Sequence, residues 1–273
     1  MEPVVDTRPL FPLLARELNS LLTTLRKDEW HAPTICPEWT VKDIVAHLLD
    51  TSLRRLSFHR DGMPLPEPDE PVSSYQDLVR FLNTLNAQWV LAARRLSPEV
   101  LTESLYRTQM EVVRFFNGLD LSRPAFFPVA WAGEAGSSCR FDIAREYTEW
   151  WIHQAQIRLA LDRPGLVSRQ LFCPMVDTLM RALPHHYRDT AAPAGSTVRV
   201  TVTAPAGGTW TIQRTGEHWE WAMPDPDLPA TATIRMEPET AWKLMSKSLH
   251  GEAARRHLVM EGDQALAMPL TRL

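Results

Sequence analysis

A carboxylate and an imidazole lie four residues apart in one strongly helical stretch of the sequence. They are Glu149 and His153, within EYTEWWIHQAQIRLAL. Because an α-helix turns once in about 3.6 residues, side chains at i and i+4 leave the same face one turn apart. A pair held in this way can chelate zinc, since the backbone fixes the spacing of the ligands before the metal arrives. The same spacing also fits a solvated surface pair, so the pair alone leaves both interpretations open.

The candidate for a third ligand is His47. It lies midway along a helix predicted to begin at Thr40, on the polar border of an apolar stripe. Two imidazoles and one carboxylate leave a fourth position of zinc open, which is the arrangement of catalytic rather than structural sites. His47, Glu149 and His153 are therefore the candidates to hold one metal ion. The alternative at His47 is a half-buried histidine with no ligand role.

Asp50 follows His47 by three residues and therefore lies about one turn beyond it. A carboxylate in this position can accept a hydrogen bond from the ring nitrogen that faces away from the metal, and so orient the imidazole. We predict this supporting role for Asp50. A solvated position on the helix surface is the alternative.

The helices that must carry these residues follow from apolar residues repeated every three to four positions. This periodicity predicts helices over residues 8–29, 40–58, 73–96, 98–116, 140–161 and 167–187. Thr40 and Asp43 form a T-x-x-D signature close to a capping box, which marks the start of the second helix. Four prolines in RDGMPLPEPDEP predict a loop before the third.

The periodicity changes after the linker-like TAAPAG of residues 190–195. Val198, Val200 and Val202 alternate with polar residues, as in a half-buried strand. Short turns then lead to TWTIQR and HWEWAM, so we predict a three-stranded meander, a fourth strand near 230–236 and a helix from Pro238. LVMEGD and a short last helix close the chain. The fold class is therefore α+β, with a helical part over 1–188 and a small α/β domain over 193–273.

Composition excludes several classes of protein. The chain has 273 residues, a net charge of -4 and a pI near 6.1, which argues against a nucleic-acid partner. No apolar run reaches the length of a membrane span, and the start MEPVVDTRPLF lacks the basic region of a signal peptide. The three cysteines are widely spaced and in no CxxC pair, which is typical of reduced thiols. We expect a cytoplasmic protein with no membrane partner.

Two segments resemble the signatures of one family. Residues 30–48, WHAPTICPEWTVKDIVAHL, resemble the opening signature of the mycothiol-dependent maleylpyruvate isomerase family of the DinB superfamily, and residues 146–160 are similar to its second signature. The stretch from TAWKLM to VMEGDQALA resembles the sterol-carrier-like domain that follows in this family. The resemblance implies a DinB-like four-helix bundle over 1–188 and a sterol-carrier-like α/β domain over 193–273. It also implies a divalent metal, usually zinc, on His47, Glu149 and His153.

The resemblance implies an enzyme with mycothiol as thiol cosubstrate. A zinc-activated thiolate would attack a small electrophile, giving S-transfer, thiol exchange or cis–trans isomerisation. In the family an arginine of the C-terminal domain serves catalysis, and Arg255 and Arg256 are the candidates here. Two other functions stay open. One is a non-catalytic, metal-containing protein that binds an apolar ligand, and the other is a metal-dependent hydrolase that uses zinc-bound water.

Overall fold

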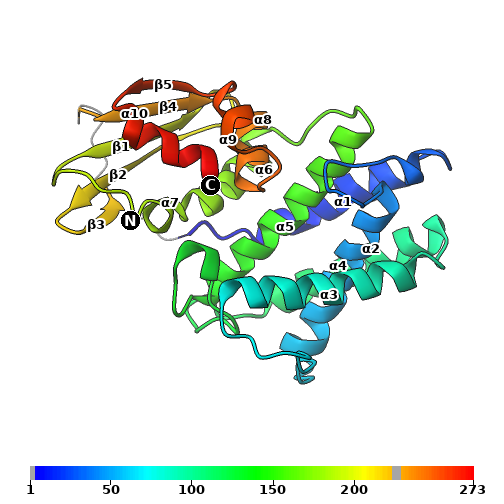
Figure 1. Cartoon of the computed structure of the whole chain (residues 1–273). Coiled ribbons are helices and arrows are strands. Elements are labelled where there is room, and N and C mark those ends of the chain that lie inside the picture. The colour runs from blue at the N-terminus through cyan, green and yellow to red at the C-terminus, as the bar shows by residue number, and fades with distance from the viewer. Residues whose placement is uncertain (1–3, 223–228) are drawn as a thin grey trace. The chain divides into compact units, whose positions relative to one another are not determined.

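The computed structural model describes residues 4–222 and 229–273. These residues form two compact units (Figure 1). The helical unit comprises Thr7–Phe126 and Glu149–Gly165. The sheet unit comprises Phe127–Thr148, Leu166–Leu273 and the residues before Thr7. Helices dominate the first and a mixed sheet lies in the second, so the predicted α+β class is confirmed.

The helical unit is a bundle held together by apolar and aromatic side chains. Helix α4 packs against both α1 and α2, and α2 also packs against α3. The ring of Phe11 meets Phe116 and Trp150 edge-on, at centroid distances of 5.3 and 4.8 Å. These contacts join α1, α4 and the second half of α5. The helices are α1 (Phe11–Leu22), α2 (Val41–Arg54), α3 (Tyr75–Ala93), α4 (Pro98–Asn117) and the part of α5 (Cys139–Ala160) that begins at Glu149.

The predicted start of α2 is confirmed. The Thr40 hydroxyl accepts a hydrogen bond from the backbone N–H of Asp43 at 3.3 Å, and the Asp43 carboxylate accepts one from the backbone N–H of Thr40 at 3.0 Å. This reciprocal capping box satisfies two N–H groups that have no partner within the helix. It fixes the first turn of the helix, and His47 lies two turns further along.

The ends of the first two helices differ from the prediction. Helix α1 ends at Leu22 rather than at residue 29, because the hydroxyls of Thr23 and Thr24 donate to carbonyls of the preceding turn at 3.0 and 2.7 Å. Such bonds offer the backbone an alternative to a continued helix. Beyond α2 the chain continues as a more widely wound π-helix over Arg55–Arg60, close to the predicted end at residue 58.

The helix predicted over 167–187 is two helices, α6 (Arg169–Met180) and α7 (Leu183–His186). Pro184 has no N–H to donate to the carbonyl four residues earlier, so a continuous helix loses a bond at this point. The backbone turns at residues 181–182 and restarts with Pro184 in the first turn of α7, where a missing N–H costs nothing.

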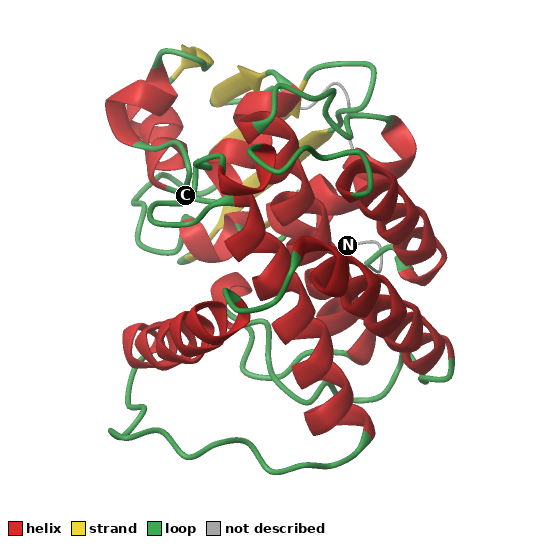
Figure 2. Ribbon diagram, turned by 90° about the vertical axis from the view of Figure 1, so that its right-hand side faces the viewer, coloured by secondary structure: helices red, strands yellow, loops and turns green. Residues whose placement is uncertain are grey.

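In the described part of the sheet unit, five strands form one sheet, in the order β3-β2-β1-β4-β5 (labelled in Figure 1 and coloured yellow in Figure 2). β1 pairs antiparallel with β2 and parallel with β4, while β2–β3 and β4–β5 are antiparallel. The predicted meander β1-β2-β3 is confirmed, and Met223 at the end of HWEWAM lies outside the described residues. The strands are β1 (Thr197–Val202), β2 (Thr209–Thr215), β3 (His218–Trp221), β4 (Ala232–Met236) and β5 (Val259–Gly262).

Short helices complete the sheet unit. They are α8 (Pro238–Met245), α9 (Gly251–Arg255) and α10 (Gln264–Ala267), of which α9 was not predicted. Single 3-10 turns occur at Arg8–Leu10, Glu29–His31, Ala130–Ala132 and Met268–Arg272.

The domain boundary between residues 188 and 193 stays a prediction. Across the residues that the structure describes, none of the helices has the length and apolar character needed to span a membrane.

Candidate metal centre

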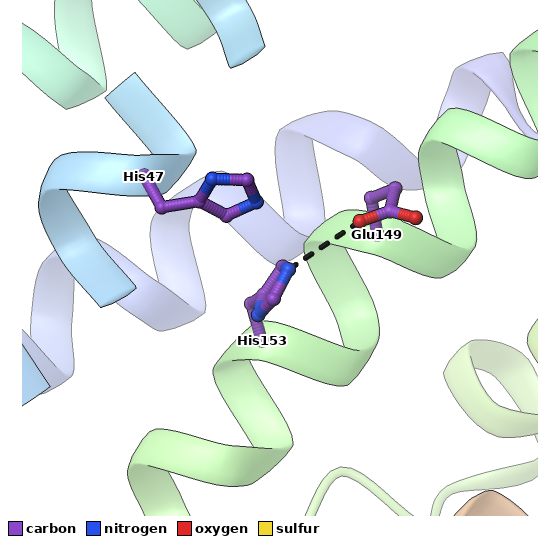
Figure 3. Close-up of side chains that lie close together, drawn as sticks. All are labelled: His47, Glu149 and His153. Atoms are coloured by element: carbon purple, nitrogen blue, oxygen red, sulfur yellow. Dashed lines mark ion pairs between the residues drawn. The ribbon is translucent and has the colours of Figure 1, made fainter. Parts of the chain in front are cut away.

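Two helices of the helical unit bring the three predicted ligands together. The imidazole of His47 extends from α2 toward Glu149 and His153 on α5 (Figure 3). One ligand atom of each residue lies within 4.8 Å of the ligand atoms of the other two. More than one hundred residues separate His47 from the other two in the sequence. The packing of α2 and α5 in one bundle therefore creates a cluster that neither helix holds alone.

The spacing suits a common ion after a modest adjustment. Zinc bonds nitrogen and carboxylate oxygen at about 2.0–2.2 Å, so two ligands of one tetrahedral ion lie about 3.3–3.6 Å apart. Any pair near the upper limit of 4.8 Å must therefore close by about 1 Å. Side chains on rigid helices can make such a shift by small rotations about their own bonds. The residues present thus fit a divalent metal by donor type and by distance.

His47 forms the buried side of the cluster. It is 6% exposed, and burial, reinforced by the nearby His153, lowers its pKa to about 3. The ring is therefore neutral at physiological pH. A neutral imidazole keeps a free lone pair, which is the form that binds a metal.

The α5 side of the cluster is more open. The Glu149 side chain is 41% exposed, whereas His153 is 12% exposed, and the two approach to 3.3 Å between Oε2 and Nε2. A carboxylate at the edge of the cluster supplies the negative charge that offsets part of the charge of a divalent ion. Its exposure also gives an incoming ligand access from the side of Glu149.

An aromatic side chain not predicted from the sequence lies against the two imidazoles. The Trp39 ring centroid is 4.9 Å from that of His47 and 6.3 Å from that of His153. The loop before α2 positions it, with Glu38 in the left-handed region (φ 68°) and a hydrogen bond from Trp39 N–H to the Cys36 carbonyl at 3.2 Å. Trp39 therefore forms an apolar wall beside the ligand atoms.

The remaining predicted site residues are Asp50, Arg255 and Arg256. Asp50 forms an ion pair with Arg54 at 2.8 Å, and no hydrogen bond between described residues joins it to His47. Its role in orienting His47 stays a prediction without a supporting contact. Arg255 and Arg256 are exposed at the end of α9 in the sheet unit, and their catalytic role likewise stays a prediction.

Sequence reasoning missed Gln156, which contacts a predicted ligand directly. Its Oε1 lies 2.7 Å from Nδ1 of His153. The signal was available, because a residue three positions after His153 shares its helix face. Trp39 had no such signal, since its position depends on the conformation of a loop.

Comparison with known proteins gives the same family as the motifs. Residues 11–158 match the family described as mycothiol maleylpyruvate isomerase N-terminal domain, and residues 177–273 match the SCP-2 sterol transfer family. Two solved structures share the fold: a mycothiol-dependent maleylpyruvate isomerase, and a histidine-to-alanine mutant of such an isomerase. Each aligns with a TM-score of 0.55 and 12% identity over 95% of this chain and 93% of the other. No curated protein matches the chain. Since the first family covers more than half of the sequence, the chain belongs to the mycothiol maleylpyruvate isomerase family, which is a family of enzymes.

Proposed function

We propose that this protein binds a divalent metal, zinc, through His47, Glu149 and His153 and uses it to activate a small thiol. The observation that carries the proposal is the clustering of two imidazoles and one carboxylate within 4.8 Å. Three protein ligands leave at least one position for an exchangeable ligand. A zinc ion in such a site stabilises a bound thiolate at neutral pH.

The protein's own residues prepare the site. Because burial keeps the pKa of His47 low, its ring is already neutral at physiological pH and has no proton to lose when a metal binds. Glu149 contributes a charge that becomes more favourable when an ion is bound beside it. Trp39 excludes water from one side of the imidazoles. Together these features would let His47, Glu149 and His153 hold a metal that an incoming ligand could reach from the exposed side of Glu149.

The reactive sulfur comes from a cosubstrate in this proposal. Cys36, which lies in the loop beside the site, is half-buried, and burial together with the charge of Glu149 raises the pKa of its thiol. A thiol with a raised pKa is a poor nucleophile at neutral pH. We therefore assign the thiol to mycothiol, in accord with the family to which the chain belongs.

The second substrate is a small electrophile. When the thiolate adds to one carbon of an activated double bond, the displaced electron pair moves onto the activating group, and the two carbons are then joined by a single bond that can rotate. Return of that electron pair expels the thiolate and restores the double bond in the other configuration, which is cis–trans isomerisation. If the neighbouring carbon instead takes up a proton from solvent, the sulfur stays on the substrate, which is S-transfer.

Metal content of the unaltered chain and of His153→Ala tests the metal part of the proposal. We expect about one zinc per chain before the change and none after it, since removal of one of three ligands leaves too few donors. Glu149→Gln should weaken zinc binding, because a neutral amide is a poorer ligand than a carboxylate. His31→Ala, which removes an exposed histidine of the same unit, is the matched control and should keep the metal.

A panel of electrophiles assayed with and without mycothiol tests the chemistry. Turnover that requires both thiol and metal supports the proposal. Equal turnover without thiol would assign the protein to the hydrolases, with zinc-bound water as nucleophile. No turnover with any partner, combined with intact metal binding, would favour a protein that only binds a ligand. Separate alanine substitutions of Arg255 and Arg256 test their catalytic role, which requires a fall in kcat.

A further inference from the structure

The two imidazoles of the metal centre differ in the partners of their ring nitrogens. His153 has a partner at each ring nitrogen: Gln156 Oε1 lies 2.7 Å from Nδ1, and Glu149 Oε2 lies 3.3 Å from Nε2. Nδ1 of His47, by contrast, has no hydrogen-bond partner among the described residues. Only the ring on α5 therefore has a side chain that can select which nitrogen carries a proton.

Gln156 is held firmly in place. It is 4% exposed, three residues after His153 on α5, so the helix backbone fixes its position relative to the ring. A buried amide that loses its partner destabilises the folded state, because no water replaces the lost hydrogen bond. The hydrogen bond between Gln156 and Nδ1 of His153 therefore stabilises the folded state.

The chemistry of the contact determines the state of the ring. The amide oxygen of glutamine accepts hydrogen bonds and donates none, so the nitrogen that faces it must carry the proton. A ring with its proton on Nδ1 offers the lone pair of Nε2, which faces Glu149, the other ligand on the same helix. Were the amide turned by half a rotation, its NH₂ group would face Nδ1 and demand the opposite tautomer.

We propose that Gln156 is a positioning residue that keeps a proton on Nδ1 of His153 and so reserves Nε2 for the metal. The inference rests on the metal centre proposed above and adds a residue that does not touch the ion. Metal-bound histidines commonly donate their other N–H to an acceptor in this way, and loss of the acceptor weakens metal binding by about 10–100-fold.

The first experiment reads the tautomer directly in the metal-free, full-length protein. Histidine labelled with nitrogen-15 gives separate signals for the two ring nitrogens, and comparison with His153→Asn assigns those of His153. We expect Nδ1 to show the shift of a protonated nitrogen. A bare Nδ1 with the proton on Nε2 alone would overturn the proposal.

The second experiment measures zinc affinity in three variants by competition with a chelator. Gln156→Met removes the acceptor at similar length and should weaken zinc binding by about 10–100-fold. Gln156→Glu restores an acceptor and should bind zinc at least as tightly as the unaltered chain. A Gln156→Met chain that binds zinc as well as the unaltered one, or a Gln156→Glu chain that binds as poorly as the methionine variant, would refute the role.

Gln154 provides the matched control, because it is a fully buried glutamine on the same helix. Its amide, oriented to satisfy both neighbours, donates to the Leu14 carbonyl and accepts from the Leu18 N–H at 3.3 and 2.9 Å. Gln154→Met should therefore lower thermal stability and leave zinc affinity unchanged. If the unaltered chain binds no zinc, the metal centre itself fails, while the tautomer of the metal-free protein still decides the role of Gln156.

Discussion

Helices α2 and α3 begin in the same way and are buried to very different extents. Each has a hydroxyl at its N-cap, Thr40 or Ser74, followed three residues later by an aspartate. Ten of the 14 residues of α2 are buried, whereas in α3, as the structure describes it, only Val90 and Ala93 of 19 are. The local signals that start a helix therefore say little about whether it belongs to the core.

Two hydrogen bonds link α2 to the second half of α3. The Trp89 indole N–H donates to the Ala46 carbonyl at 2.8 Å, and Arg54 donates to the Asn86 side chain at 2.7 Å. The helix that carries His47 also packs against α4 and against the 3-10 turn at Glu29–His31, and these contacts add to its burial. The comparison indicates that burial of α2, and not its capping, gives His47 the environment of a ligand.

Truncation of one leucine on each helix should give the largest contrast. Leu48 of α2 is fully buried, whereas Leu82 of α3 is 39% exposed. We expect Leu48→Ala to lower the free energy of unfolding by about 2–5 kcal/mol, because it removes apolar contacts and leaves a cavity. Leu82→Ala should change it by less than about 0.5 kcal/mol. Denaturant unfolding measures both, and equal losses would show that α3 is as much part of the core as α2.

Acid should destabilise the metal-free protein through His47. Its pKa is about 3 in the folded chain and about 6.5 in the unfolded chain, so between these values only the unfolded chain takes up the proton. Stability due to this group is complete above pH 6.5 and falls as the pH drops toward 3, by up to about 1.4 kcal/mol per pH unit. His47→Gln should flatten the profile measured in the presence of a chelator. His31→Gln, a change at an exposed site, should leave it unaltered, and a parallel effect of both changes would remove His47 as the cause.

Removal of the N-cap hydroxyl should lower the free energy of unfolding more at α2 than at α3, by a smaller difference than the leucine changes give. Thr40→Ala deprives the buried Asp43 of a hydroxyl at 2.8 Å as well as removing the cap, so we expect a loss near 2 kcal/mol. Ser74→Ala removes a cap from an exposed helix end and should cost about 0.5 kcal/mol. Thermal or denaturant unfolding compares them. Equal losses would mean that the environment of a cap does not affect its contribution.

Most of the architecture could be predicted because it follows from periodicity. The alternation of Val198, Val200 and Val202 identified β1, and T-x-x-D at Thr40 located the start of α2. The parallel pairing of β1 with β4 could not be predicted, since pairing partners are chosen by tertiary packing and not by the pattern within a strand. The end of α1 at Leu22 was missed because side-chain hydroxyls competed there with an otherwise regular apolar stripe.

In the candidate site, too, some features follow from the spacing of residues in the sequence and others depend on packing. The spacing of Glu149 and His153 predicted one shared face, and the structure places His47 beside them. The low exposure of α2 and the identity of the group facing Nδ1 of His153 depend on packing, so Gln156 was recognised only in three dimensions. The role of Asp50 stays a prediction, and the contact that the structure shows for this carboxylate is its ion pair with Arg54.

The position of Trp39 makes its fluorescence a reporter of metal binding at the site. Its ring lies 4.9 and 6.3 Å from the two imidazoles, within the short range over which an open-shell ion such as cobalt(II) quenches indole emission. Filling of the site can therefore be followed by the protein's own fluorescence, with no dye attached. Trp39→Phe should remove that part of the emission change while His47, Glu149 and His153 still bind the ion.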